Sequence, residues 1–176
     1  FLLANPETAF QEFKARDYLS SILEEKGFEV VKKVGGVETS FLARPAGCPQ
    51  TRPTVAMLAE YDALPKIGHG CGHNLIAAAG LGAAIVLRRI LGDKAGGLIL
   101  VGPPAEEGGG GKALLAEAGV FEGIDAAMMF HPSSTNIPGQ GMLGRTKFKV
   151  EFFGRTAHAS FAPDQGINAL DALNLA

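Results

Sequence analysis

Short apolar runs alternate with helical stretches between residues 54 and 131, and this alternation constrains the fold more than any other feature of the chain. The runs 54–59, 98–101 and 126–130 are bounded by turn residues and have the length of strands rather than of helices. Strands that alternate with helices pair in parallel through right-handed crossovers. We therefore predict a β-α-β-α-β order in which the carboxyl ends of these strands meet at one edge of a parallel sheet.

The segments before this alternation predict a helix and a hairpin. Asn5 as N-cap, followed by proline at the first helical position, favours a helix over 7–26. Residues 28–34 and 37–44 are rich in β-formers and flank a Gly-Gly pair, which is typical of a hairpin turn. We expect this hairpin to form an antiparallel edge of the sheet.

Two helices are expected between the parallel strands, over 75–91 and 112–118. The pattern then changes, because apolar and polar side chains alternate over 145–153, which predicts an antiparallel strand. A further helix is expected from about residue 167. The change of pattern places a domain boundary near residue 144.

Composition limits the class of protein. With 176 residues, 47% of them hydrophobic and 19% charged, the chain can bury a core as one domain or as a domain plus part of another. The net charge of −2 gives no basic face for nucleic acid, and no run of roughly 18 apolar residues predicts a membrane span. Cys48 and Cys71 are too few for a disulfide scaffold and favour thiols in a reducing, cytoplasmic compartment. Because the chain begins with Phe1 and has no visible signal sequence, we expect that both ends are cut.

Acidic, imidazole and thiol side chains follow the predicted strands at their carboxyl ends, where ligands bind in such sheets. They are Glu60, Asp62, His69, Cys71 and His73 after the first strand, Glu106 and Glu107 after the second, and His131 after the third. Loop polar residues are more commonly Ser, Asn, Asp and Lys. The clustering therefore indicates the site of a metal-dependent hydrolase.

Cys71-Gly72-His73 places a thiol and an imidazole two residues apart, too close for one helix face, so a turn before the helix is expected to present them. Zinc accepts cysteine sulfur, histidine nitrogen and carboxylate oxygen, and a catalytic zinc site keeps one position open. The alternative is a buried structural cysteine beside a hydrogen-bonded histidine. A zinc finger is excluded because no second Cys/His pair stands at finger spacing.

Glu106 and Glu107 are adjacent, so in extended backbone they point in opposite directions. One of them can bind an ion while the other holds a proton near a water molecule. The alternative is a helix start, where the dipole favours acidic side chains. A phosphate-binding loop is excluded because Glu106 stands at its first glycine position and Ala113 replaces its Ser or Thr.

The remaining candidates are weaker when each is taken alone. His131 could be an ordinary loop histidine, but its place at the shared edge makes it a candidate ligand. Asp62 could be a ligand or could orient one through a hydrogen bond, and His69 could do likewise. His158 lies beyond the predicted boundary, where the simpler reading is a turn residue.

Six stretches together resemble peptidase family M20, the dinuclear-metal aminoacylases, carboxypeptidases and amidohydrolases. They are residues 60–65 (EYDALP), 69–74 (HGCGHN), 104–108 (PAEEG), 130–132 (FHP), 154–159 (GRTAHA) and 166–171 (GINALD). The Cys-Gly-His form resembles the branch with hippurate, auxin-conjugate and aminobenzoyl-glutamate hydrolases. Asn74, where many members carry Asp, resembles the aminoacylase-one-like hydrolases of dipeptides that end in Lys, Orn or Arg.

The resemblance implies a fold and a division into domains. It implies an α/β fold, a three-layer α/β/α catalytic domain with a mostly parallel sheet, of which residues 1–143 form the N-terminal part. Residues 144–176 would begin a smaller α+β lid domain through which the family forms homodimers. The family's last metal-binding histidine is not among the four histidines of this chain, so the chain is expected to be the front part of a longer enzyme.

The resemblance also implies roles for single residues. The implied metal ligands are Cys71, His73, Glu107 and His131. Glu106 resembles the general base, and Asp62 resembles the aspartate that supports the site. His158 resembles the histidine that the lid lends to a partner's active site to stabilise an oxyanion. Other branches have a histidine at the position of Glu60, so the ligand set is expected to be that of the Cys-Gly-His branch.

We therefore expect a metal-dependent hydrolase of amide bonds in N-acyl amino acids or dipeptides, with zinc or manganese as the metal and two ions in the complete enzyme. Its substrates would be small molecules, without a nucleic-acid or membrane partner. The rival hypothesis is a non-catalytic remnant that binds metal or peptide. A nucleotide-binding Rossmann domain is a third and weaker hypothesis, because no GxGxxG motif follows a predicted strand.

Overall fold

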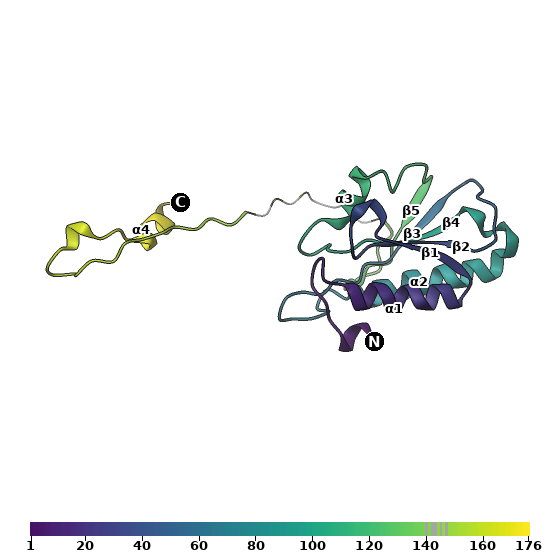
Figure 1. Ribbon diagram of the computed structural model, residues 1–176, viewed down its shortest axis with the longest axis horizontal. Helices are drawn as coiled ribbons and strands as arrows, with labels where there is room; N and C mark the ends of the chain where they lie inside the picture. The colour runs from purple at the N-terminus through teal and green to yellow at the C-terminus, as the bar shows by residue number, and fades with distance from the viewer. Residues whose placement is uncertain (140, 142–143, 145, 147) are drawn as a thin grey trace. The chain divides into compact units, whose positions relative to one another are not determined.

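The computed structural model describes residues 1–139, 141, 144, 146 and 148–176. These form two compact units, Phe1–Thr135 and Asn136–Ala176 (Figure 1). The first unit is an α/β sandwich, and the second holds two short helical segments. The assignment of residues 1–143 and 144–176 to a catalytic and a lid domain stays a prediction.

A five-stranded mixed sheet lies at the centre of the first unit, with the strand order β1-β2-β4-β3-β5. The strands are β1 (Phe28–Lys32), β2 (Phe41–Pro45), β3 (Val55–Leu58), β4 (Leu98–Gly102) and β5 (Ala126–Met128). β3 pairs in parallel with both β4 and β5, whereas β2 pairs antiparallel with β1 and β4. This confirms the predicted parallel core with an antiparallel hairpin at its edge.

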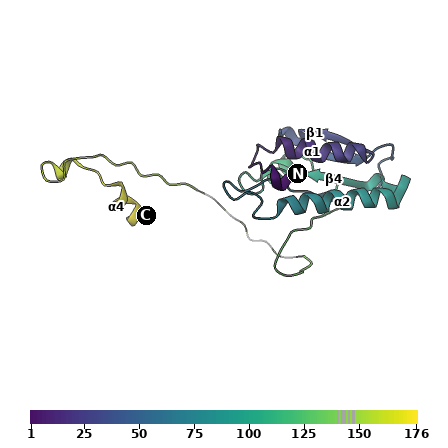
Figure 2. The ribbon, with the colours of Figure 1, turned by 90° about the horizontal axis from the view of Figure 1, so that it is seen from below.

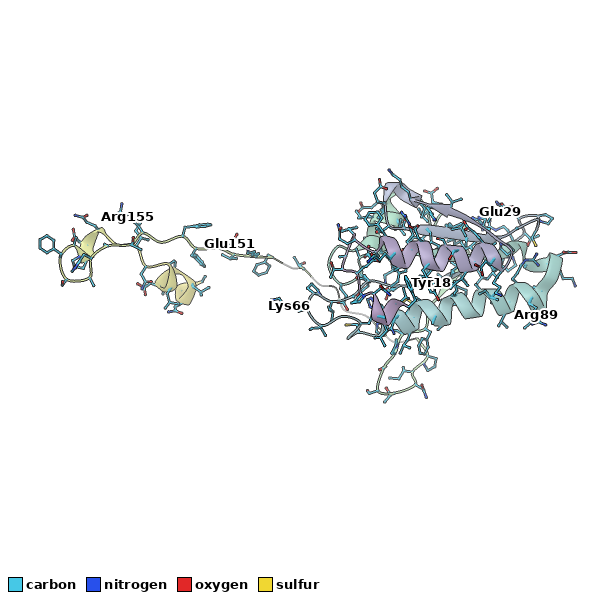
Figure 3. All side chains as sticks on the ribbon, turned by 60° about the horizontal axis from the view of Figure 1, so that its bottom comes forward. Tyr18, Glu29, Lys66, Arg89, Glu151 and Arg155 are labelled. Carbon is cyan, nitrogen blue, oxygen red and sulfur yellow. The ribbon has the colours of Figure 1, made fainter. Side chains whose placement is uncertain are left out.

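Helices cover both faces of this sheet, which gives the predicted three-layer arrangement. α1 (Phe13–Glu25) and α2 (His73–Leu91) lie along one face, and α3 (Gly111–Glu117) lies on the other (Figures 1 and 2). One apolar cluster joins α1 and α2 to the sheet, and a second surrounds Leu115 of α3. Every residue of β4 is buried, as expected for a strand that is covered on both faces. Tyr18 of α1 and Arg89 of α2 lie on the exposed faces of their helices (Figure 3).

The segment His73–Gly97, which contains α2, is long and apolar enough by length and composition to cross a membrane. In the structure, however, α2 buries Ile76, Ala77, Leu81 and Ala84 against the sheet. Its first residue, His73, is 1% exposed. These contacts are those of a core helix, whose apolar character follows from packing on the sheet.

The predicted start of the first helix at residue 7 is wrong, because α1 begins at Phe13. Phe10 has a φ of 61°, which interrupts the helical path. The carboxylate of Glu7 instead accepts hydrogen bonds from the backbone N–H groups of Lys14 and Ala15. Glu7 therefore caps the first turn of α1 from outside the helix, and satisfies two of its free donors. Asn5 is not the N-cap, and its side chain donates to the carbonyl of Phe1.

The connection between β1 and β2 is wider than the predicted tight turn. A 3-10 turn over Val34–Gly36 takes its place, and the strands end and restart several residues away from the Gly-Gly pair. Gly35 has a φ of 59°, and a Cβ on it would lie 2.9 Å from the Cβ of Ala118. Glycine is needed at this position because the turn packs against the segment that follows α3.

The second unit holds a 3-10 turn at Pro163–Gln165, helix α4 (Ala169–Leu175) and a bridge between Arg155 and Ile167. The predicted helix near 167 is confirmed. Of the strand predicted over 145–153, residues 145 and 147 lie outside the described residues, and 148–153 do not form a strand. These residues have no partner strand among the described part of the unit, and an isolated strand cannot satisfy its backbone donors and acceptors.

Candidate metal centre

The ends of β3 and β4 bring two loops together, as the parallel pairing requires. The N–H of Ala59 donates to the carbonyl of Val101 at 3.0 Å, which extends the pairing beyond β3. Glu60, Tyr61 and Asp62 follow directly, and all three are buried. Glu106 and Glu107 follow β4 on the neighbouring loop. The predicted shared edge is therefore where the acidic side chains converge.

His73 is the first residue of α2, so it is presented by the helix itself and not by the preceding turn as predicted. Gly72 is the N-cap and has a φ of 78°. A Cβ on Gly72 would lie 2.9 Å from Cγ of Pro132. Gly72 thus supplies the left-handed backbone that starts the helix and lets the segment of His131 and Pro132 approach it.

Asp62 links the two loops through its two carboxylate oxygens. Oδ1 lies 2.7 Å from Nδ1 of His73, and Oδ2 accepts the backbone N–H of Glu107 at 2.9 Å. Burial raises the pKa of Asp62, but the hydrogen bonds from His73 and Glu107 outweigh it and hold this pKa below its usual value. Burial lowers the pKa of His73, whereas Asp62 and the neighbouring carboxylates raise it by more. Asp62 thus holds the ring of His73 and the backbone of Glu107, and its role in supporting a metal site stays a prediction.

The other ring nitrogen of His73 faces carboxylates. Nε2 lies 3.5 Å from Glu60 Oε2, 3.8 Å from Glu106 Oε2 and 3.8 Å from Glu107 Oε1. Neither His73 Nε2 nor Glu60 Oε2 has a hydrogen-bond partner among the described residues. Because Nδ1 holds its proton toward Asp62, a neutral ring points the lone pair of Nε2 at these oxygens. A cation between them would satisfy every one of these groups.

His131 completes the cluster from the segment after β5. Ligand atoms of Glu60, His73 and His131 lie within 4.8 Å of one another, as do those of His73, Glu106 and Glu107. Nδ1 of His131 lies 2.9 Å from the carbonyl of Pro132. A carbonyl can only accept, so Nδ1 carries the proton and the lone pair of Nε2 is left for a cation.

Cys71 lies beside the same carboxylates, although it belongs to neither of the two groups. Its thiol donates a hydrogen bond to Glu107, and this bond together with burial raises its pKa to about 11. A bound cation favours the thiolate and would replace that proton. Cys71, Glu107 and His131 line an open cleft of about 760 Å³, together with His69 and Asn74. Substrate could reach the cluster through this cleft.

Lys112 of α3 forms an ion pair with Glu60, whose side chain is 1% exposed. The sequence pattern did not predict this ion pair, because it joins helix α3 to the loop after β3. Glu60 was predicted to belong to the cluster but not to be a ligand, whereas the structure brings one of its carboxylate oxygens within 4.8 Å of ligand atoms of His73 and His131. The sequence did contain a signal for this ion pair, namely a lysine at the start of the helix predicted shortly after Glu106 and Glu107.

His69 belongs to neither of the two groups of ligand atoms. His69 lines the cleft, and burial lowers its pKa. His158 belongs to the second unit, where Nδ1 accepts the backbone N–H of Phe161 at 3.2 Å. Its role toward a partner's active site stays a prediction.

The donor set fits a divalent cation. It combines a thiol, two imidazoles whose Nδ1 atoms are hydrogen-bonded, and carboxylates, which are the ligand types of zinc. The approach of three carboxylates to Nε2 of His73, at 3.5 to 3.8 Å, is the observation that favours a cation at this point. The ligand roles of Cys71, His73, Glu107 and His131 stay predictions that this geometry supports.

Comparison with known proteins agrees with this geometry. The model of peptidase family M20/M25/M40 matches residues 56–173. The chain is 41% identical to Xaa-Arg dipeptidase of Mus musculus, over 97% of this chain and 42% of that protein. It is 36% identical to one of the subunits of p-aminobenzoyl-glutamate hydrolase of Escherichia coli (strain K12), over 97% of this chain and 39% of that protein.

Solved structures give the same result. A dinuclear metal binding peptidase from the M20 family of Bacillus subtilis is 29% identical, with a TM-score of 0.62, over 72% of this chain and 39% of that chain. The chain spans about two fifths of the length of these relatives.

Proposed function

The chain belongs to peptidase family M20/M25/M40, and from this membership we propose that the full-length protein hydrolyses amide bonds in N-acyl amino acids or dipeptides with the help of a divalent metal. The observation that carries the proposal is Nε2 of His73, which faces Glu60, Glu106 and Glu107 at 3.5 to 3.8 Å. An imidazole nitrogen and carboxylate oxygens that converge on one point are donor types of a divalent cation such as zinc, and a bound cation would interact favourably with all of them.

The two adjacent glutamates have different surroundings, which supports different roles. Glu107 is held by Asp62 through its backbone N–H and by Cys71 through its carboxylate, and its side chain is 15% exposed. The side chain of Glu106 is 32% exposed. These surroundings support Glu107 as the metal ligand and Glu106 as the group that exchanges a proton with water.

When bound, a divalent cation would polarise the scissile carbonyl and lower the pKa of the attacking water. Glu106 takes the proton from this water and returns it to the departing amine. Asp62 keeps His73 in the tautomer that presents the lone pair of Nε2. The cleft beside Cys71 and His131 admits the substrate.

Zinc is the metal that this donor set favours, because a thiolate selects zinc over manganese or magnesium. Two ions in the complete enzyme, a cytoplasmic location and a homodimer formed through the lid domain belong to the same proposal. The name of the 41% identical relative, Xaa-Arg dipeptidase, supports dipeptides that end in a basic residue as substrates. The name of the 36% identical relative supports p-aminobenzoyl-glutamate as the alternative.

The test uses the full-length protein, stripped of metal with a chelator and then reloaded with zinc or manganese. Metal content and hydrolysis are measured together on acetylated amino acids, dipeptides ending in Arg or Lys, and p-aminobenzoyl-glutamate. The proposal expects hydrolysis that disappears with the metal and returns with it. Stoichiometric metal binding without hydrolysis of any of these amides would instead support a non-catalytic remnant.

A further inference from the structure

Glu12 is a buried carboxyl group that contacts the loop of the metal centre from a distant part of the chain. It precedes α1 directly, and its residue is 0% exposed. Oε1 accepts the backbone N–H of Ala105 at 2.9 Å. Burial raises the pKa of Glu12, and Thr39 and the N–H of Ala105 offset part of this effect. Such a group is unfavourable in a protein interior unless its hydrogen bonds are needed.

Ala105 has an unfavourable backbone conformation within this loop. It has a φ of 57°, a left-handed conformation that alanine rarely adopts. It stands directly before Glu106 and Glu107, so its backbone angles set the direction in which both side chains leave the loop. Its carbonyl accepts the N–H of Gly109 at 3.0 Å, which closes a turn around the acidic pair.

Three side chains hold successive points of this loop. The hydroxyl of Tyr61 contacts the carbonyl of Gly102 at 2.9 Å, and Asp62 accepts the N–H of Glu107. Both of these side chains come from the segment after β3. Glu12 holds Ala105, between those two points, and comes from the segment directly before α1. The strained residue is thus fixed by a side chain from this segment.

We propose that Glu12 is a positioning residue of the metal centre. Its carboxyl oxygen holds Ala105 in the left-handed conformation and thereby aims Glu107 at the metal and Glu106 at the water. The inference rests on the proposed function for these two roles. Glu12 itself touches neither metal nor substrate.

The test compares three variants of the full-length protein. Glu12→Gln keeps an amide oxygen that can accept the N–H of Ala105, whereas Glu12→Met has a similar shape and no acceptor. Leu23→Ala is the control, because Leu23 is a buried residue of α1 that packs in the core and not on the loop. Metal affinity is measured by competition with a chelator, and ligand geometry by the visible spectrum of the cobalt-substituted protein.

We expect Glu12→Met to weaken metal binding about 10- to 100-fold, the usual effect of losing a group that orients ligands, and to change the cobalt spectrum. Glu12→Gln and Leu23→Ala should bind metal within about threefold of the unaltered protein, although Leu23→Ala is less stable. Unchanged metal affinity in Glu12→Met would overturn the proposal. So would an equal loss in Glu12→Gln, because an oxygen acceptor would then be insufficient.

A second measurement on the unaltered protein remains decisive if Glu12→Met fails to fold. The amide hydrogen of Ala105 should be among the slowest to exchange in the loop over residues 103–111, since a buried carboxyl accepts it. Fast exchange at Ala105 would contradict the proposal. Metal affinity and exchange do not depend on hydrolysis, so an inactive but metal-binding protein would refute the proposed function without affecting this result.

Discussion

Oδ1 of Asp62 lies 2.7 Å from Nδ1 of His73, and both side chains are almost completely buried. This contact decides which nitrogen of the ring carries a proton. The lone pair of Nε2 is consequently directed at Glu60, Glu106 and Glu107. In the neutral ring, this pairing leaves a lone pair on the opposite nitrogen, which is the form in which histidine binds a metal.

Replacing Asp62 by Asn should lower metal affinity about 10- to 100-fold, because the amide holds the ring less firmly and supplies no negative charge. Chelator competition measures the effect. Asp125→Asn is the matched control, since Asp125 is also paired, with the exposed Arg52. Equal losses in both variants would show that Asp62 acts only through overall stability.

The adjacent glutamates should separate metal binding from turnover. Glu106→Gln is expected to keep the metal content and to lower kcat by about 10²- to 10⁴-fold, since the base is lost. Glu107→Gln is expected to lose metal as well. Metal analysis and steady-state rates on the same samples distinguish the two variants. Persistent turnover in Glu106→Gln would refute its role as the base.

Lys112→Met should destabilise the metal-free protein by about 1–3 kcal/mol, because it leaves the buried carboxylate of Glu60 without its partner. Urea unfolding in the presence of a chelator measures this loss. Adding Glu60→Gln to Lys112→Met should restore most of the stability, since no unpaired charge then remains. A double variant as unstable as the sum of the single ones would mean that the pair is not coupled.

The raised pKa of Glu12 predicts how stability depends on pH. A group whose pKa is raised on folding stabilises the protein below its ordinary value of 4.5, and this contribution is lost as the pH rises through the raised value. The free energy of unfolding should therefore decline more with rising pH in the unaltered protein than in Glu12→Gln. Urea titrations from about pH 4 to about pH 8 measure the difference. Parallel curves for the two proteins would contradict the shift.

The parallel strands and the site at their carboxyl ends could be predicted because local patterns determine them. Apolar runs of strand length, separated by helices, impose the sheet edge at which Asp62, His73 and Glu107 meet. The Cys-Gly-His spacing indicated metal chemistry for a related reason, since few other sites need these groups so close together.

Other features depend on contacts between distant segments, which local patterns do not reveal. Glu7 caps α1 from outside the helix, so its role could not be read from the helix pattern. Glu12 meets Ala105 across 93 positions of sequence, and the ion pair of Lys112 with Glu60 joins helix α3 to the loop after β3. The strand predicted over 145–153 failed where described, because alternation alone does not supply a partner strand.

The central claim is a metal held at the edge of the sheet, and X-ray anomalous scattering tests it most directly. Crystals of the full-length protein grown with zinc are measured on both sides of the zinc absorption edge. The account predicts an anomalous peak about 2.0–2.3 Å from donor atoms of Cys71, His73, Glu107 or His131, with at least two of these residues as ligands. A fully occupied peak elsewhere, with none of these four residues coordinated, would contradict it.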